Sequence, residues 1–308
     1  MNKKICIIIP VYNEASNIVV MLSAIKIVMQ TLPYNYNIIY IDDGSSDDSL
    51  LFLKKLAADD KLINYISFSK NFGHQNALKA GLDLSDADAV ISMDGDMQHP
   101  PSLLPQLITL WEAGNDVVYT IRQNEKEMPF IKRTTSNLFY NILNKLSSIE
   151  IENGTADFRL LDRKVVNVIR EIKEYDLFWR GMVKWLGFKQ TSIEYVPAER
   201  ANGVSKYNFK KMMELALKGI TSFSTKPLTI AIYLGFASAL ISLAYIPYAL
   251  LSILYGHPVS GWASVIVTIA FFGGIQLMIL GIIGMYLGKL FMQSKQRPHY
   301  IINETNIK

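Results

Sequence analysis

Short apolar runs alternate with amphipathic segments through the first two thirds of the chain. Runs rich in Ile, Val and aromatic residues predict buried strands at 5–11, 36–41, 63–68, 90–93, 116–121 and 189–196, with a shorter strand from 155. Apolar residues at helical spacing predict helices at 15–30, 74–84, 100–114, 128–146 and 164–172, and a short helix from 178. Because strands alternate with helices, the pattern predicts an α/β fold with a doubly wound, mostly parallel sheet.

The last third of the chain is far more apolar. Segments 228–256 and 258–288 contain no charged residue, and each exceeds the roughly 20 residues that a membrane-spanning helix needs. Basic residues flank the pair on both sides, at Lys218, Lys226, Lys289, Lys295 and Arg297. Since positive charge favours the cytoplasmic side, we expect two transmembrane helices with the N-terminal domain and both termini in the cytoplasm.

A basic segment, 200–226, precedes the first apolar segment. Its apolar residues recur at helical spacing, which is typical of a helix that lies on an anionic membrane surface. An ordinary surface helix of the domain is the alternative. We therefore divide the chain into a domain at 1–199, an interfacial region at 200–226, two spans at 227–292 and a cytoplasmic tail at 293–308.

Composition excludes several classes of protein. The net charge is only +4, which gives no general case for binding nucleic acid. The single cysteine, Cys6, lies in an apolar run, so no internal disulfide can form and a buried thiol in a reducing compartment is expected. The first strand is not followed by Gly-x-Gly-x-x-Gly, and the chain contains no P-loop motif, so a dinucleotide dehydrogenase and a P-loop NTPase are both disfavoured.

Polar residues gather where three of the predicted strands end. These are Asn13-Glu14, Asp42-Asp43 and the pair Asp94 and Asp96. Open α/β sheets bind ligands at the carboxyl ends of their strands, so we expect the three clusters to form one cleft. Asp-x-Asp is common in solvated turns, but two carboxylates at a strand end favour Mg²⁺ or Mn²⁺.

The motifs together resemble a known family. Pro10-Val11-Tyr12-Asn13-Glu14, Asp42-Asp43-Gly44-Ser45 and Asp94-Gly95-Asp96-Met97-Gln98-His99-Pro100 look like the nucleotide-sugar half of family 2 glycosyltransferases of GT-A fold. Asp157-Phe158-Arg159 and the run from Arg200 to Lys206 are similar to polyprenyl-phosphate glycosyltransferases. Among these, the two apolar segments resemble the bacterial undecaprenyl-phosphate (bactoprenol) glucosyltransferases more than the dolichol-phosphate mannose synthases.

The resemblance implies a set of donor-binding residues. The nucleotide sugar would be held by Pro10, Tyr12, Glu14, Asp43, Asp94, Gly95, Gln98 and Arg122. Mg²⁺ or Mn²⁺ would be bound by Asp96, the better ligand, and Asp94, while Asp42 would brace its turn. Tyr12 could instead be a packed ring, Glu14 a helix N-terminal acid, and Arg122 a partner in a surface salt bridge. His99 could be a metal ligand, but a structural role is favoured.

The implied acceptor is a lipid phosphate, undecaprenyl phosphate. A phosphate monoester is largely dianionic at neutral pH, so it needs cations to align it more than a general base. Arg133, Arg200, Ser205 and Lys206 are the candidates, and Arg200 and Lys206 fit the family motif best. Asp157 would orient the sugar or the acceptor, unless it only forms a salt bridge with Arg159 or Arg163. The expected catalytic set is Asp157, Asp96, Arg200 and Lys206.

The sequence therefore predicts a membrane-anchored, inverting, metal-dependent glycosyltransferase in the bacterial plasma membrane. It would move a hexose, most often glucose, from a UDP-sugar to undecaprenyl phosphate, and relatives suggest a homotetramer. Alternatives are transfer to another lipid such as diacylglycerol, and mannosyl transfer from GDP-mannose. A processive polysaccharide synthase is disfavoured because Gln-x-x-Arg-Trp is absent, and a non-enzymatic assembly or flipping partner because the carboxylate set is intact.

Overall fold

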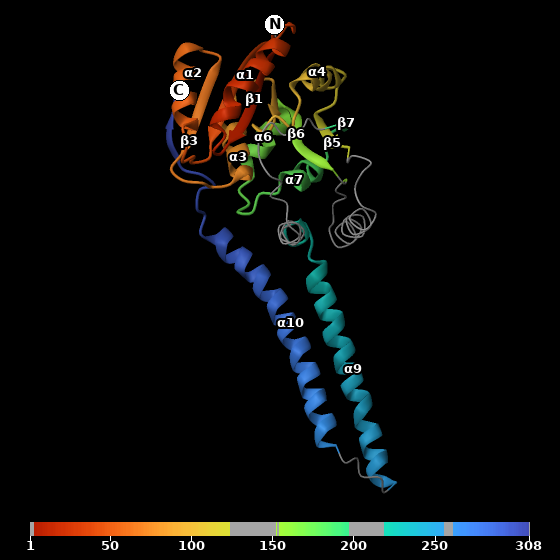
Figure 1. The fold of residues 1–308 in the computed structure, drawn as a ribbon. Coiled ribbons are helices and arrows are strands. Elements are labelled where there is room, and N and C mark those ends of the chain that lie inside the picture. The colour runs from red at the N-terminus through yellow and green to blue at the C-terminus, as the bar shows by residue number, and fades with distance from the viewer. Residues whose placement is uncertain (1–2, 124–151, 153, 197–218, 256–260, 308) are drawn as a thin grey trace.

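A computed structural model describes residues 3–123, 152, 154–196, 219–255 and 261–307. It contains a domain built on one sheet, from which two long helices project together (Figure 1). The expected helix at 128–146 and most of the basic segment at 200–226 lie outside the described residues.

The order of the elements confirms the predicted alternation of strands and helices. The strands are β1 Lys4–Val11, β2 Asn35–Asp42, β3 Ile63–Phe68, β4 Ala89–Ser92, β5 Val117–Arg122, β6 Thr155–Asp162, β7 Gln190–Tyr195 and β8 Ile302–Thr305. The helices are α1 Ala15–Met29, α2 Ser49–Asp59, α3 His74–Leu84, the 3₁₀ turn η1 Pro101–Leu103, α4 Leu104–Glu112, α6 Arg163–Glu171, α7 Trp179–Trp185, α9 Lys226–Leu254 and α10 Trp262–Ser294.

The sheet is mixed, with the order β7-β5-β6-β4-β1-β2-β3-β8. The four strands β4, β1, β2 and β3 run parallel, as predicted. Strand β6 is antiparallel to both β4 and β5, and β7 runs parallel to β5. The carboxyl ends of the parallel strands, which carry the polar clusters, therefore meet at one edge of the sheet.

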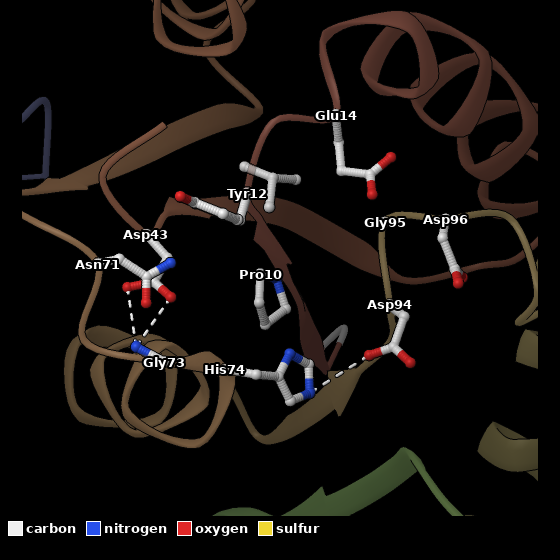
Figure 2. A pocket seen from close by; sticks show the side chains of 11 residues that line it. Pro10, Tyr12, Glu14, Asp43, Asn71, Gly73, His74, Asp94, Gly95 and Asp96 are labelled. Atoms are coloured by element: carbon white, nitrogen blue, oxygen red, sulfur yellow. Dashed lines mark hydrogen bonds and ion pairs between the residues drawn. The ribbon is translucent and has the colours of Figure 1, made fainter. Parts of the chain in front are cut away.

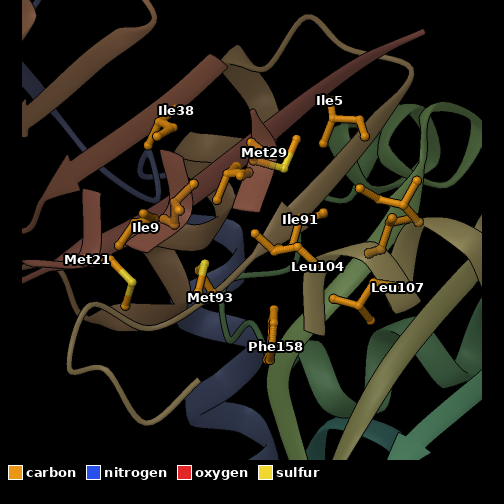
Figure 3. Close-up of a cluster of buried hydrophobic side chains, with 14 of the residues drawn as sticks. Ile5, Ile9, Met21, Met29, Ile38, Ile91, Met93, Leu104, Leu107 and Phe158 are labelled. Carbon is orange, nitrogen blue, oxygen red and sulfur yellow. The ribbon is translucent and has the colours of Figure 1, made fainter. Parts of the chain in front are cut away.

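Apolar side chains fill both faces of the central strand β1, because its residues alternate between two clusters. Ile5, Ile7 and Ile9 pack beneath α1, α2 and α4 (Figure 3), while Cys6 and Ile8 pack against α3, α6 and α7. All five are fully buried. Burial of Cys6 raises the pKa of its thiol to about 12, so the prediction of a buried, unreactive cysteine agrees with the structure.

Helices α9 and α10 have the length and composition to cross a membrane. At 1.5 Å per residue they extend over about 43 and 50 Å, more than the roughly 30 Å hydrocarbon core. The apolar window of α10 contains no buried residue and that of α9 very few. The core helix of a soluble domain would be mostly buried, so the exposed apolar surface of these two helices favours contact with lipid.

The end of α10 is fastened to the domain near α7. Lys289 Nζ lies 3.2 Å from a carboxylate oxygen of Asp176 and 3.0 Å from Ser222 Oγ. Gln293 accepts from the Tyr175 amide at 2.5 Å and donates to the Lys173 carbonyl at 2.8 Å. The residues that precede α7 are therefore held by the second long helix.

The C-terminal tail is part of the domain, which corrects the expected boundary at residue 199. Strand β8 pairs antiparallel with β3 and forms the edge of the sheet. Ahead of it, the Tyr300 ring stacks on Phe68 with centroids 5.2 Å apart, and its hydroxyl donates to Asp83 at 3.0 Å. The sequence expectation failed because a four-residue strand carries little local signal and its partner lies far away in the chain.

Candidate active site

A cavity of about 330 Å³ opens at the carboxyl ends of β1, β2 and β4 (Figure 2). It is lined by Pro10, Val11, Tyr12, Glu14, Asp43, Asn71, Gly73, His74, Asp94, Gly95 and Asp96. All three polar clusters predicted from the strand ends contribute to this lining. The expectation that they form one cleft is therefore confirmed.

Side chains tie the turns after β1 and β2 together. Asn13, whose φ of 56° is left-handed, donates its amide to Ser45 Oγ at 2.9 Å, and its side-chain oxygen accepts from the Ser46 amide at 2.8 Å. Asp42 accepts from the Ser45 amide at 3.0 Å and from the Ser67 hydroxyl at 2.9 Å. Asp42 thus braces its turn, as predicted, and Asp43 is the residue of the pair that lines the cavity.

At one end of the cavity, Asp43 faces the loop before α3. Its carboxylate accepts from the Phe72 amide at 2.6 Å and from the Gly73 amide at 2.9 Å. Burial raises the pKa of Asp43, and these two amides oppose the rise. Tyr12 is 48% exposed, so its ring is accessible to a planar ligand rather than packed in the core. Glu14 accepts from the Asn17 side chain at 2.5 Å and still lines the cavity.

The opposite end holds the Asp-Gly-Asp segment. Asp96 accepts from the Gln98 amide at 3.1 Å, which closes a tight turn. A Cβ added to Gly95 would lie 3.1 Å from Val11 Cγ1 and 3.3 Å from the Pro10 carbonyl oxygen. The segment therefore packs closely on the end of β1, and glycine suits that position for steric reasons.

His99 supports Asp94 from behind the cavity. It is 4% exposed, stacks on Phe158 with centroids 5.1 Å apart, and accepts from the Asp94 amide at Nδ1 over 2.9 Å. Its Nε2 lies 3.5 Å from the Asp94 carboxylate. Of the two roles considered from the sequence, the structure supports the structural one.

The donor set at this end suits a divalent cation. Asp94 Oδ1 is buried without a hydrogen-bond partner, and a buried carboxylate oxygen in that state is costly unless a ligand meets it. Within the described ranges, no cluster of three or more His, Cys, Asp and Glu is placed to hold a metal. Asp94 and Asp96 would supply two hard oxygen ligands, and water or a bound phosphate group would fill the other positions.

Asp157 lies on β6 among arginines. Its two oxygens are 2.8 Å from Arg159 Nη2 and 3.2 Å from Arg180 Nη2. Burial alone would raise the pKa of Asp157, but the guanidinium groups of Arg180 and Arg159 outweigh it and hold that pKa well below its usual value. Of the two salt-bridge partners expected from the sequence, Arg159 is found and Arg163 is not, because Arg163 pairs with Asp86 at 2.8 Å. A role for Asp157 in transfer stays a prediction.

The remaining predicted residues lie beside the cavity or outside the described ranges. Arg122, at the end of β5, has its Nη1 3.5 Å from Gln98 Oε1, and neither residue lines the cavity. Their expected contacts with a diphosphate stay predictions. The acceptor-phosphate candidates Arg133, Arg200, Ser205 and Lys206 are outside the described residues.

Three residues at the site were missed by the sequence reasoning. Asn71 and His74 line the cavity from the loop after β3 and the start of α3, and Arg180 reaches Asp157 from α7. The rule of polar residues at strand ends covers Asn71 and His74, since β3 is a parallel strand with its carboxyl end at the same edge. No local pattern identifies Arg180.

Comparison with known proteins places the chain among sugar transferases. Residues 6–170 match the model of glycosyl transferase family 2. The chain is 41% identical over 306 residues to the bactoprenol glucosyl transferase of Shigella phage SfV, covering 99% of this chain and 100% of that protein. It is 41% identical over 300 residues to an uncharacterised glycosyltransferase of Bacillus subtilis strain 168, and the alignment covers 97% of this chain and 93% of that protein.

Among solved structures, a mannosyltransferase from Pyrobaculum calidifontis in complex with GDP-mannose and Mn²⁺ aligns with 96% of this chain and 87% of its own, at 13% identity and a TM-score of 0.49.

Proposed function

This chain belongs to glycosyl transferase family 2, and we propose that it transfers a hexose, with glucose the first candidate, from a UDP-sugar to undecaprenyl phosphate. One observation carries the proposal. A chain similar over 99% of its length to a bactoprenol glucosyl transferase gathers the carboxylates of three strand ends around one cavity, and it also has two exposed apolar helices.

The donor would lie along the cavity. Pro10, Tyr12, Glu14 and Asp43 would receive the nucleoside, and Gln98 and Arg122 the ribose and diphosphate beside the cavity. Gly95 would let the diphosphate approach the backbone. Asp96 and Asp94 would hold Mg²⁺ or Mn²⁺, which when bound neutralises charge on the leaving diphosphate as a Lewis acid.

The acceptor supplies its own nucleophile. A lipid phosphate is largely dianionic at neutral pH, so an in-line attack of its oxygen on C1, with inversion, needs no proton removed by the protein. The lowered pKa of Asp157 supports this route, since a carboxylate paired with Arg159 and Arg180 is a poor general base. Asp157 would instead orient the sugar. Alignment of the phosphate would fall to Arg133, Arg200, Ser205 and Lys206.

The acceptor would reach the site from the bilayer. Helices α9 and α10 would span the plasma membrane, with the interfacial region at 200–226 on its cytoplasmic surface. Strands β1 and β8 belong to one sheet, so both ends of the chain lie on the same side of the two helices, and the positive flanks assign that side to the cytoplasm. A homotetramer is the proposed assembly, on the resemblance alone.

The full-length enzyme in detergent, with Mg²⁺ or Mn²⁺, tests the proposal. Undecaprenyl phosphate is offered with UDP-glucose, UDP-N-acetylglucosamine, UDP-galactose or GDP-mannose in turn, and nucleotide release and the glycolipid product are measured. We expect UDP release that depends on the lipid phosphate, and a β-linked product. Diacylglycerol is offered in parallel, and transfer to it instead of to undecaprenyl phosphate would favour the alternative acceptor. No transfer from any donor would contradict the enzymatic proposal.

A further inference from the structure

His74 lies in the cavity between the two functional carboxylates. It is the first residue of α3, and the preceding Gly73, with a φ of 95°, turns the chain into the helix. Its Nε2 is 3.4 Å from Asp94 Oδ1 and 3.9 Å from Asp157 Oδ2 (Figure 2 shows the contact with Asp94). One ring nitrogen thus lies near a carboxylate that follows β4 and near another on β6.

The contacts of His74 Nε2 with the two carboxylates are long. At 3.4 and 3.9 Å the nitrogen is too far for a good hydrogen bond to either carboxylate. Asp94 Oδ1 has no hydrogen-bond partner, although it is buried. Because Asp94 Oδ1 is the oxygen assigned to the cation, the acceptor that remains for a hydroxyl bound to His74 is Asp157 Oδ2, 3.9 Å from the same nitrogen.

His74 differs from His99 in its exposure and in the contacts of its ring nitrogens. His99 is 4% exposed, and one ring nitrogen bonds a backbone amide. The His74 side chain is 40% exposed and opens into the cavity. The first ring holds Asp94 in place, while the second faces the space where a ligand would lie.

We propose that His74 binds the sugar of the donor, with its Nε2–H donating to a sugar hydroxyl that in turn donates to Asp157. This inference rests on the proposed function and adds a residue to it. Nε2 carries the hydrogen because it faces two acceptors. Asp43 and Asn71 lie at the nucleoside end and Asp94 and Asp96 at the diphosphate end of the cavity (Figure 2). Near the diphosphate end, His74 faces Asp157, the residue proposed to orient the sugar.

The test separates the sugar from the nucleotide. Binding of UDP and of UDP-glucose is measured by calorimetry on full-length wild type, His74→Ala and His74→Gln, with Mg²⁺ and without acceptor. His299→Ala is the control, because His299 lies in the tail beside Lys79 and Asp83. We expect His74→Ala to weaken UDP-glucose about five- to tenfold, the worth of one hydrogen bond. UDP affinity should stay within about twofold, and Gln, which keeps an N–H donor, should restore part of the loss.

Each other outcome overturns the inference. Equal weakening of UDP and UDP-glucose would assign His74 to the nucleotide or to the fold. Unchanged binding of both, with wild type binding UDP-glucose normally, would refute the sugar contact and leave the proposed function intact. The wild type is also titrated with UDP-N-acetylglucosamine and UDP-galactose. If it binds UDP but none of the three UDP-sugars, the proposed donor and this inference are both overturned.

Discussion

We expect Asp157→Asn to destabilise the domain, because the substitution breaks a buried ion pair. Asp157 is 7% exposed and Arg159 is 4% exposed, and they meet at 2.8 Å. Asparagine keeps the shape but removes the charge that compensates a buried guanidinium. Arg180, with its side chain 27% exposed, can turn toward water, so its share of the loss is small.

The magnitude follows from burial. Removing one partner of a buried ion pair costs about 3–5 kcal/mol, and we take about 3 because the amide can still accept a hydrogen bond. For a domain of this size, 1 kcal/mol shifts the melting temperature by about 2–4 °C. The melting temperature of the variant in detergent should therefore lie about 6–12 °C below that of wild type. The chain offers a matched control in Asp86→Asn, since Asp86 pairs with Arg163 at the same 2.8 Å but is 94% exposed. Its effect should be below about 2 °C.

The stability that Asp157 contributes should depend on pH only in the acid range. The pKa of Asp157 is lowered in the folded state, so its contribution is present above the unfolded pKa of about 3.9 and is lost only as pH falls through the folded pKa. The gap between variant and wild type should be constant from about pH 5.5 to 8.5. A variant that melts within 2 °C of wild type yet is inactive would refute the reasoning and assign Asp157 to the chemistry itself.

Other changes test the remaining parts of the site and fold. Asp96→Asn should fold normally but lose transfer by about a hundredfold or more, because it removes a ligand of the proposed Lewis acid; full activity in EDTA-washed membranes would contradict the metal role. His99→Phe keeps the ring stack but removes the acceptor of the Asp94 amide, so we expect a loss of about 1–3 kcal/mol in unfolding experiments, together with weaker Mn²⁺ affinity by titration; a variant equal to wild type in both would show that this hydrogen bond is dispensable. Deleting residues 300–308 exposes the β3 edge, so melting should fall by several degrees and aggregation should increase in light scattering; an unchanged melt would mean that β8 adds no stability.

Much of the cleft could be predicted because its residues follow strands that are visible in the local sequence pattern. A strand is visible as an apolar run, parallel strands end at the same edge, and ligand-binding residues follow those ends. Glu14, Asp43 and Asp96, which all line the cavity, follow that rule. His74 obeys it too, but it stands beyond a glycine turn, at the start of a helix, where a polar residue also serves as an ordinary surface position.

The contacts that the sequence did not reveal are tertiary. Residues two apart on a strand point to the same face, so the pairing of Asp157 with Arg159 was one of the two salt bridges expected from the sequence. Arg180 reaches the same carboxylate only because α7 packs beneath β6. Lys79 is likewise 3% exposed, although lysine in a helix normally signals a solvated face, because α6 packs over it and the Arg170 carbonyl accepts from its ammonium at 3.2 Å.

Strand β8 follows both long helices in the chain, so the strand that pairs with β3 at the edge of the sheet is synthesised after them. In the proposed topology the ribosome releases β8 only after both spans have left it, so the edge of β3 stays open during insertion. If only one span entered the bilayer, the tail would be on the wrong side and β3 would keep a row of unpaired backbone groups, the kind of edge that promotes aggregation. In the proposed topology, a complete, protease-resistant domain would therefore require that both helices had inserted correctly.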